Sequence, residues 1–167
     1  MVNVVDNGDS DTFTSDELET WSAVATLLEW LPVALDTQLQ RDSGMSHFEF
    51  GILFALSQAE GQTLRMSTLA GYANSTLSRL SRAVARLERR DWVRRAPDPH
   101  DGRITVAILT ASGRDAAHAA APGHVALVRK LVFDSLTRAQ AERLGQSSLR
   151  IAEAIRADGP WRPEGER

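Results

Sequence analysis

The chain has 167 residues, 43% of them hydrophobic, and a formal net charge of −3 at pH 7. This length suits one compact domain, or a small domain with helical extensions, and excludes two large domains. Because the sequence contains no cysteine, disulfides, thiolate metal sites and cysteine-based redox switches are excluded as well. No stretch of about 18 uncharged apolar residues predicts a membrane span, and the acidic first residues do not resemble a signal peptide, so we expect a cytoplasmic protein with no membrane partner.

The first ordered element is expected to be a long helix. Residues 1–12 are polar and are expected to be disordered. Thr14 and Glu17 then have the spacing of a capping box, which predicts a helix start. Apolar residues recur every three or four positions from there to about residue 41, as they do along one face of a helix. Pro32 is expected to kink this helix.

The next stretch has the outline of a helix-turn-helix. Ser46 and Glu49 repeat the capping-box spacing and predict a helix of about a dozen residues. A short helix is expected over residues 66–73, and after a tight connection a longer one starts at Ser75 or Thr76. The sequence does not decide between these two caps. Two helices joined by a tight connection are typical of a helix-turn-helix.

After this longer helix the period of the pattern changes. Residues 92–96 (WVRRA) and 104–110 (ITVAILT) are predicted to be short β-strands, and the segment between them is dense in turn residues, so a β-hairpin is expected. Beyond the hairpin the pattern is helical again, and Thr137 with Gln140 opens a last helix. Residues 158–167 are expected to form a flexible tail.

Positive charge is concentrated in residues 75–103. This segment holds eight arginines and four acidic residues, a net charge of +4, whereas the other 138 residues carry 11 basic and 18 acidic side chains, a net of −7. A basic segment in an acidic protein indicates a local site for a polyanion, because phosphate neutralisation needs positive charge on one face only.

The helix that starts at Ser75 or Thr76 is amphipathic. Leu77, Leu80 and Val84 are spaced three or four apart and should face the core, which leaves an arginine-rich face outside. Such a face, taken alone, is more often simply solvated. Hydroxyl groups near a helix N-terminus followed by arginine also suit a DNA major groove, where arginine pairs with guanine and the helix dipole attracts phosphate. The expected DNA-binding residues on this helix are Ser75, Thr76, Ser78, Arg79, Arg82 and Arg86, of which Arg86 is expected to contact phosphate.

The hairpin adds further DNA-binding candidates. Arg94 and Arg95 lie on its first strand, and Arg103 follows its tip. A long guanidinium at a hairpin tip could enter a narrow, electronegative minor groove. Asp101 could hold this guanidinium by a charge-assisted hydrogen bond. The alternative, a salt bridge that tightens the turn, can hold at the same time.

The segment LAGYANSTLSRLSRAVARLERRDWVRRAPDPHDGRITVAILTASGR resembles the DNA-binding core of the MarR family of bacterial transcriptional regulators. The shared elements are RLE followed by a turn and WV, the acidic-to-arginine wing DPHDGR, and LT..G at the start of the next helix. The likeness is strong over residues 45–113 and extends, by helix order and length, over most of residues 14–157. Asp91 departs from the pattern, because a glycine usually closes the recognition helix there.

The resemblance implies a mainly α, α+β winged helix fold and a single domain over residues 13–157. Residues 45–109 would form a winged helix-turn-helix DNA-binding lobe, and residues 14–44 and 110–157 would form dimerisation helices. The protein would be a homodimer without a cofactor that binds double-stranded DNA at an inverted repeat and acts as a repressor. The apolar stripes on the first and last helices support dimerisation independently, because they exceed what the lobe needs for its own core.

The resemblance also implies release from DNA by a small aromatic or anionic ligand held between the dimer helices and the DNA-binding lobe. Aromatic residues at helical spacing usually belong to the core, and a lone histidine is more often a hydrogen-bonded or surface residue than a ligand contact. The candidates that could line such a pocket are Trp21, Trp30, His47, Phe48, Phe54 and His118.

Two other interpretations were weighed. An enzyme is not expected, because the sequence has no G-x-S-x-G, no Walker loop and no histidine-rich metal spacing. His100 with Asp98 and Asp101 could be mistaken for a metal cluster, but such residues at a turn tip usually form only the turn, so no metal site is expected. The remaining alternative is a winged helix whose arginine face meets an acidic protein and which has no operator.

Overall fold

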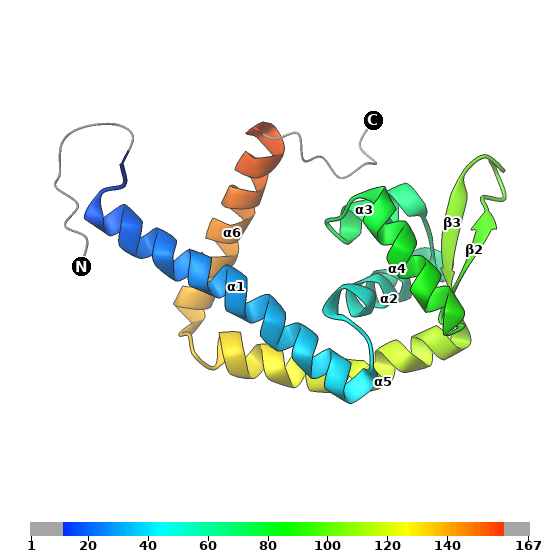
Figure 1. The fold of residues 1–167 in the computed structure, drawn as a ribbon, viewed down its shortest axis with the longest axis horizontal. Helices are drawn as coiled ribbons and strands as arrows, with labels where there is room; N and C mark the ends of the chain where they lie inside the picture. The colour runs from blue at the N-terminus through cyan, green and yellow to red at the C-terminus, as the bar shows by residue number, and fades with distance from the viewer. Residues whose placement is uncertain (1–11, 159–167) are drawn as a thin grey trace. The chain divides into compact units, whose positions relative to one another are not determined.

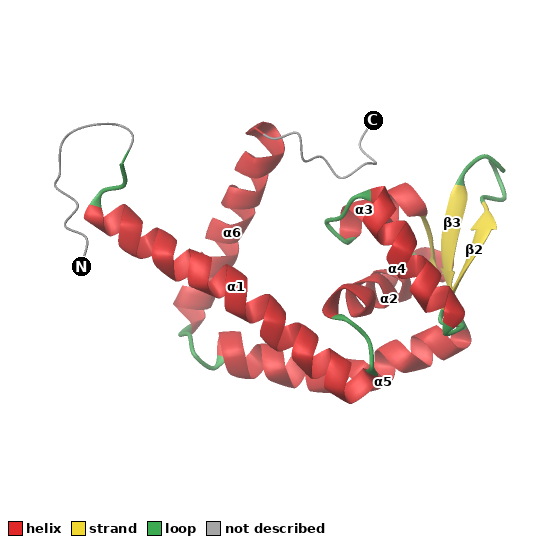
Figure 2. Ribbon diagram, viewed as in Figure 1, coloured by secondary structure: helices red, strands yellow, loops and turns green. Residues whose placement is uncertain are grey.

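The structure is a computed structural model that describes residues 12–158. Its residues fall into two compact units, divided between Ala34 and Leu35. The predicted disordered start (1–12) and flexible tail (158–167) therefore lie outside the described residues, apart from positions 12 and 158. The elements in chain order are α1 (Ser15–Ser43), α2 (His47–Gln58), the 3-10 turn η1 (Glu60–Gln62), β1 (Thr63–Arg65), α3 (Met66–Tyr72), α4 (Leu77–Arg89), β2 (Val93–Pro97), β3 (Thr105–Leu109), α5 (Ala111–Val128), the π-helical turn η2 (Arg129–Phe133) and α6 (Arg138–Asp158) (Figures 1 and 2).

The first unit consists of the N-terminal part of α1. The Thr14 N–H donates to Glu17 Oε2 at 2.8 Å and the Glu17 N–H donates to Thr14 Oγ1 at 3.3 Å, so the predicted capping box is confirmed. Pro32 lies inside the helix, and the kink expected there stays a prediction. Large apolar side chains such as Trp21 and Trp30 are exposed in this unit.

The second unit has its core between α2, α3, α4, the sheet and the start of α5. Figure 1 shows these helices gathered beside the β2–β3 hairpin. The capping box predicted at the start of α2 is present, with Ser46 Oγ accepting from the Glu49 N–H and Glu49 accepting from the Ser46 N–H. The side chains that are fully buried in this core include Leu39, Ile52, Leu53, Leu56, Leu69, Leu80, Val84 and Leu87.

The sheet has three antiparallel strands in the order β1-β3-β2. The predicted hairpin is confirmed, with Val93 opposite Leu109 and Pro97 opposite Thr105. β1, which pairs Leu64 with Ala107, was not predicted from the sequence. A strand of three residues is too short to show the alternation of apolar and polar residues that marks a strand in a sequence. β1 is a strand only because it pairs with β3.

Residues with positive φ end both helices of the helix-turn-helix. Asn74 (φ 45) follows α3, and Asp91 (φ 55) follows α4. At the second site the Asp91 N–H donates to Glu88 O at 2.9 Å and the Trp92 N–H donates to Leu87 O at 3.0 Å. This is the Schellman arrangement that usually contains glycine, so aspartate takes the left-handed conformation here.

The motif LT..G forms the corner between β3 and α5. Thr110 Oγ1 accepts the Gly113 N–H at 3.0 Å and its hydroxyl donates to Asp91 O at 2.6 Å, which caps α5 and ties it to the end of α4. A Cβ on Gly113 would lie 2.0 Å from Trp92 O, well inside van der Waals contact. Gly113 is therefore required by the close approach of α5 to the backbone that leads into β2.

The C-terminal helices complete the second unit. α5 continues through Pro122 before the π-helical turn η2. Thr137 caps α6 as predicted, since its N–H donates to Gln140 Oε1 at 2.9 Å and its Oγ1 accepts the Gln140 N–H at 3.3 Å. Over residues 12–158, no helix is both long and apolar enough to cross a membrane.

We expect Gly113→Ala to lower the free energy of unfolding by about 2–3 kcal/mol, because the backbone of Trp92 must move to admit the methyl group. Chemical denaturation at one fixed protein concentration measures the change. Gly51→Ala is the matched control, because no atom lies within 4 Å of a Cβ built on this glycine of α2, and we expect it to raise the free energy of unfolding by up to about 1 kcal/mol. Equal effects of the two substitutions would contradict the close approach.

Candidate nucleic-acid interface

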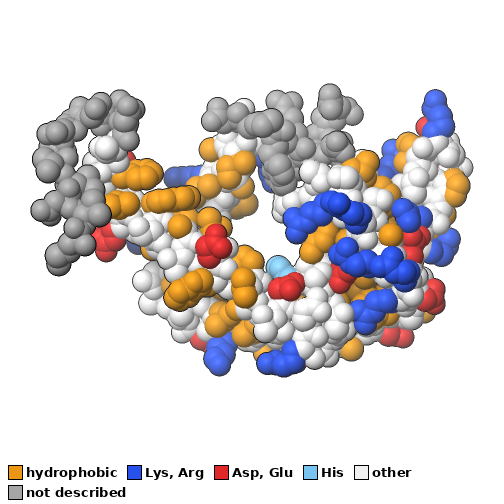
Figure 3. All heavy atoms as spheres, viewed as in Figure 1, with side chains coloured by type: hydrophobic (Ala, Val, Ile, Leu, Met, Phe, Trp, Pro, Cys, Tyr) orange, Lys and Arg blue, Asp and Glu red, His pale blue; other side chains and the backbone are white. Residues whose placement is uncertain are grey.

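The recognition helix α4 presents the polar face that the sequence predicts. Leu80, Ala83, Val84 and Leu87 are buried, while Ser78, Arg79, Arg82 and Arg86 are exposed on the other side. Figure 3 shows Lys and Arg side chains gathered over α4 and at the hairpin. The structure therefore confirms a basic surface on this helix.

The cap of α4 is Thr76. Its Oγ1 accepts the Arg79 N–H at 3.3 Å and lies 3.2 Å from Ser78 Oγ. Ser75, which was predicted to bind DNA, does not lie on the exposed face, because only 3% of its surface is exposed. The Ser75 N–H donates to Ala70 O in the turn that follows α3, which directs this residue into the lobe.

Three arginines of the expected site have no carboxylate within ion-pair distance among the described residues: Arg79, Arg82 and Arg94. Arg79 instead places its guanidinium carbon 4.3 Å from the centroid of the Phe48 ring, over the ring face. All three side chains are exposed. Their charges are available to an external anion.

Arg86 has an internal partner. Its Nε lies 2.6 Å from Glu49 Oε1, and the same carboxylate accepts the Ser46 N–H in the capping box of α2. Burial acts to raise the pKa of Glu49, but the hydrogen bonds from Ser46 and Arg86 outweigh it and hold that pKa below its usual value. Arg86 thus joins α4 to α2. This pair was not predicted from the sequence, because 37 positions separate the two residues and no local pattern links them.

Arg95 is also tied to α4. Its Nε and Nη2 donate to Glu88 Oε2 at 2.9 and 2.6 Å, and its backbone N–H donates to Glu88 Oε1 at 3.0 Å. The hydrogen bond from the Arg95 side chain is the main reason why the pKa of Glu88 is lowered. This pair fixes the first strand of the hairpin to the recognition helix, so Arg95 has a clear structural role.

Arg103 lies at the hairpin tip and is 91% exposed. Its Nε and Nη2 donate to Asp101 Oδ1 and Oδ2 at 3.0 and 3.1 Å. The predicted pairing is therefore present, and the Arg103 side chain is the main cause of the lowered pKa of Asp101. The pair directs the guanidinium and leaves part of it free to bind elsewhere.

The rest of the turn has a structural role. Asp98 is buried and accepts the His100 N–H at 2.8 Å and the Arg65 Nε at 2.9 Å. These two hydrogen bonds, led by the one from His100, overcome burial and lower the pKa of Asp98. Within the described part of the chain, no three His, Asp or Glu side chains are grouped so that they could hold a metal ion.

Comparison with known proteins identifies the family. A model described as MarR family matches residues 43–104. The chain is 42% identical to Sco3205, a MarR family transcriptional regulator from Streptomyces coelicolor solved in complex with DNA, over 94% of this chain and 98% of that one, with a TM-score of 0.88. The protein belongs to the MarR family.

Two further solved structures of transcriptional regulators are similar to this chain. AbsC, a MarR family transcriptional regulator from Streptomyces coelicolor, is 32% identical over 89% of this chain and 100% of that one, with a TM-score of 0.85. The transcriptional regulator BldR from Sulfolobus solfataricus is 25% identical over 86% and 100%, with a TM-score of 0.73. No curated protein gives a significant match to the sequence. The predictions of a winged helix fold and of a transcriptional regulator rather than an enzyme are confirmed.

In this MarR protein two histidines meet where α2 packs on α5. The ring centroids of His47 and His124 are 5.4 Å apart, and His124 also lies 4.7 Å from the ring of Phe50. The His47 N–H donates to Asp36 Oδ1 at 2.8 Å, while the buried Nδ1 of His124 has no hydrogen-bond partner in the described structure. His124 could not be singled out from the sequence, because it is a single histidine on a helix and its contacts come from distant segments.

Burial lowers the pKa of both histidines. For His47 the nearby charge of Asp36 opposes this effect, and for His124 the charge of His47 adds to it. The neutral forms are therefore favoured in the folded protein.

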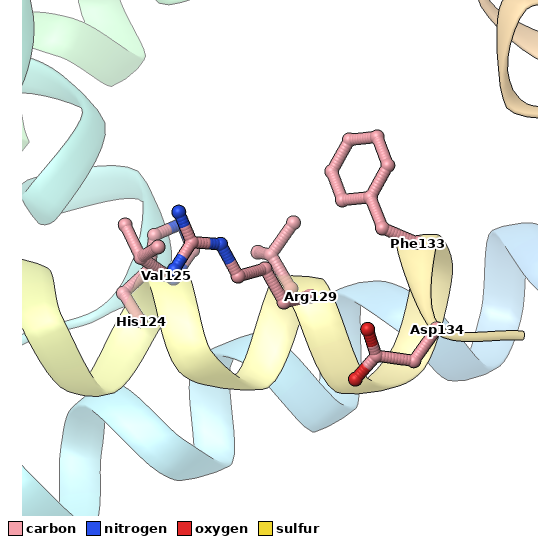
Figure 4. A pocket seen from close by; sticks show the side chains of 6 residues that line it. His124, Val125, Arg129, Phe133 and Asp134 are labelled. Atoms are coloured by element: carbon pink, nitrogen blue, oxygen red, sulfur yellow. The ribbon is translucent and has the colours of Figure 1, made fainter. Parts of the chain in front are cut away.

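Two cavities could hold a small molecule. One of about 460 Å³ lies on the C-terminal part of α5 and is lined by His124, Val125, Val128, Arg129, Phe133 and Asp134. Figure 4 shows Arg129 extending toward Val125 and His124, with Phe133 at the other end. The other, of about 880 Å³, lies between α2 and the end of α3 and includes Phe54 and Tyr72.

The predicted ligand residues of the second unit lie at different places on its surface. Phe54 lines the larger cavity, and His47 contacts His124 of the smaller one. His118 is exposed on α5 and lines neither. Trp21 and Trp30 belong to the first unit, and their part in a ligand site stays a prediction.

We expect the protein to lose stability as the pH falls from 8 to about 5.5. The folded-state pKa values of His47 and His124 lie below that of a free histidine, so the unfolded chain binds more protons as the pH drops through about 6.5. The contribution of these two neutral histidines to the free energy of unfolding is fully present above about pH 6.5. It is lost as the pH falls toward their lower, folded-state pKa values. Chemical denaturation across this range measures it.

His124→Gln should flatten this pH dependence, because glutamine does not titrate. His118→Gln, a change to an exposed histidine of the same helix, is the matched control and should leave the dependence as it is. Identical pH profiles for the wild type and His124→Gln would contradict the role of the histidine pair.

Proposed function

We propose that this protein is a homodimeric, sequence-specific DNA-binding transcriptional regulator that represses transcription at an inverted-repeat operator. The observation that carries the proposal is the set of exposed arginines on α4 and the hairpin that have no carboxylate within ion-pair distance among residues 12–158. They lie in a lobe whose fold is that of Sco3205, which was solved with DNA.

The recognition helix suits a major groove. Thr76 and Ser78 place hydroxyl groups at its N-terminus, and Arg79 and Arg82 follow on the exposed face. Hydroxyl groups bind bases or phosphates, and a guanidinium pairs bidentately with guanine. We assign these residues to the DNA contact, together with Arg94, and with Arg103 held by Asp101 at the minor groove.

The other predicted DNA contacts take different roles. Ser75 is buried and shapes the turn before α4. Arg86 and Arg95 hold α4 to α2 and to the hairpin through Glu49 and Glu88. Their remaining N–H groups still add positive charge to this surface, and Arg86 can contact phosphate with them.

Exposed apolar surface supports the homodimer. In the second unit most of the large exposed apolar side chains lie on the end of α5, η2 and α6, and α6 has no buried side chain among its described residues. Apolar surface of this extent normally marks an interface. The residues concerned are Val125, Leu131, Phe133, Leu144, Leu149, Ile151 and Ile155, and the first unit adds Leu18, Trp21, Leu28 and Trp30. A two-fold dimer would read half-sites with centres about 34 Å apart.

The proposal includes release of the protein from DNA by a small aromatic or anionic ligand. The cavity at the end of α5 combines apolar walls with the guanidinium of Arg129, a lining that suits an aromatic ring bearing a negative charge. Of the predicted ligand residues, His47 packs on the edge of this cavity through His124. Phe54 lines the larger cavity, which is a second place where such a ligand could bind.

Fluorescence anisotropy of labelled DNA from the upstream region of the gene, compared with a scrambled duplex near physiological salt, tests the function. We expect the upstream DNA to bind about tenfold more tightly or better, with a stoichiometry of two chains per operator. Adding small aromatic carboxylates to the same assay tests release. Equal, weak and salt-insensitive binding to both duplexes would favour the alternative of a protein-interaction module.

Arg103→Ala should weaken operator binding by about 1–3 kcal/mol, roughly 5- to 150-fold in Kd, because the minor-groove contact is lost. The same anisotropy titration measures the change. Arg41→Ala is the control, since Arg41 is an exposed arginine paired with a nearby carboxylate outside the winged lobe. An unchanged operator affinity of Arg103→Ala at moderate salt would remove Arg103 from the site.

A further inference from the structure

Three consecutive residues in the first turn of α2 contact three different partners. His47 meets His124 on α5, Phe48 lies under Arg79 of α4, and Glu49 binds Arg86 of α4. Arg79 and Arg86 are seven residues apart, about two helical turns, so they share one face of α4. One turn of α2 therefore holds two arginines of the recognition helix.

The two arginines are held by different chemistry. Glu49 neutralises much of the charge of Arg86 and occupies its Nε at 2.6 Å. The guanidinium carbon of Arg79 lies over the face of the Phe48 ring, 4.3 Å from its centroid. Because an aromatic ring is not a carboxylate, this contact leaves the charge of Arg79 unneutralised.

The Phe48 ring is itself fixed in place. It is partly buried and packs against the core of the second unit, whereas Arg79 is exposed and has no carboxylate within ion-pair distance among residues 12–158. An arginine on a solvated helix face has many rotamers, and binding must select one of them at an entropic cost. The ring restricts these rotamers before DNA arrives.

We propose that Phe48, which does not itself project from the recognition helix, is a positioning residue that pre-orders Arg79 for DNA. The inference rests on the proposed function, since it assigns to Phe48 a share of operator affinity that acts only through Arg79. A carboxylate at position 48 would order Arg79 as well, but it would compete with phosphate for the same N–H groups. An aromatic ring orders the guanidinium without that competition.

The test is a double-mutant cycle on operator affinity, measured by anisotropy with the full-length protein. Phe48→Leu keeps an apolar side chain in the partly buried position and removes the aromatic face. We expect it to weaken operator binding about two- to fivefold, as the loss of an exposed cation–π contact implies. In an Arg79→Ala background the same substitution should change the affinity by less than about 1.5-fold, because the partner is already gone.

Phe48→Trp provides the conservative arm, since an indole gives the strongest cation–π contact. We expect it to restore operator affinity to that of the wild type or to exceed it. Thermal unfolding of each variant verifies that the lobe is folded before the affinities are compared.

Three results would overturn the inference: a loss in Phe48→Leu that is equally large without Arg79, no loss at all, or a Trp variant as weak as the Leu variant. The first would make Phe48 a purely structural residue. Failure of the proposed function has a different signature, because the wild-type protein would then not discriminate operator from scrambled DNA in the same titration.

Discussion

The close approach of α5 to the backbone at Asp91 and Trp92 is the constraint on which the rest of the lobe depends. Thr110 donates from its hydroxyl to Asp91 O and from its N–H to Trp92 O, and Gly113 leaves the room that this contact needs. Arg90, at the C-cap of α4, stacks 3.5 Å over the Trp92 ring and donates to Gly44 O at 2.7 Å. The end of the recognition helix, the start of the hairpin, α5 and the segment after α1 are thus fixed at one corner. Because this corner sets the angle between α4 and the hairpin, it sets how the basic surface meets a ligand.

Features set by neighbouring residues could be predicted from the sequence. The capping boxes at Thr14 and Ser46 and the cap at Thr137 depend on side chains three positions apart, so their spacing alone predicts them. Features set by distant segments could not. β1 exists only through its pairing with β3, the burial of Ser75 follows from the turn after α3, and the Glu49–Arg86 pair joins residues 37 positions apart. The general location of the basic surface was therefore predictable, whereas the division of roles among its arginines was not.

The acidic residues of the lobe decide which arginines remain available. Glu49 and Glu88 each engage one arginine inside the lobe, and Asp101 orients a third at the hairpin tip. Arg79, Arg82 and Arg94 have no such partner among the described residues and keep their full charge. Three of the eight arginines in residues 75–103 thus have an internal carboxylate partner. Such pairing lowers the non-specific attraction of this surface to polyanions.

The first turn of α2 connects the two halves of the proposed mechanism through direct contacts. His47 packs on His124, which lines the cavity at the end of α5, and its neighbours Phe48 and Glu49 hold Arg79 and Arg86. A ligand or a proton at His124 therefore acts on a residue adjacent in sequence to the side chains that order the recognition helix. For such a signal to change DNA affinity, the ligand must bind one arrangement of this turn more tightly than another. The buried Nδ1 of His124 has no hydrogen-bond partner in the described structure. An arrangement of this turn that brought a polar group of the ligand to this nitrogen would gain a hydrogen bond, and the ligand would favour that arrangement.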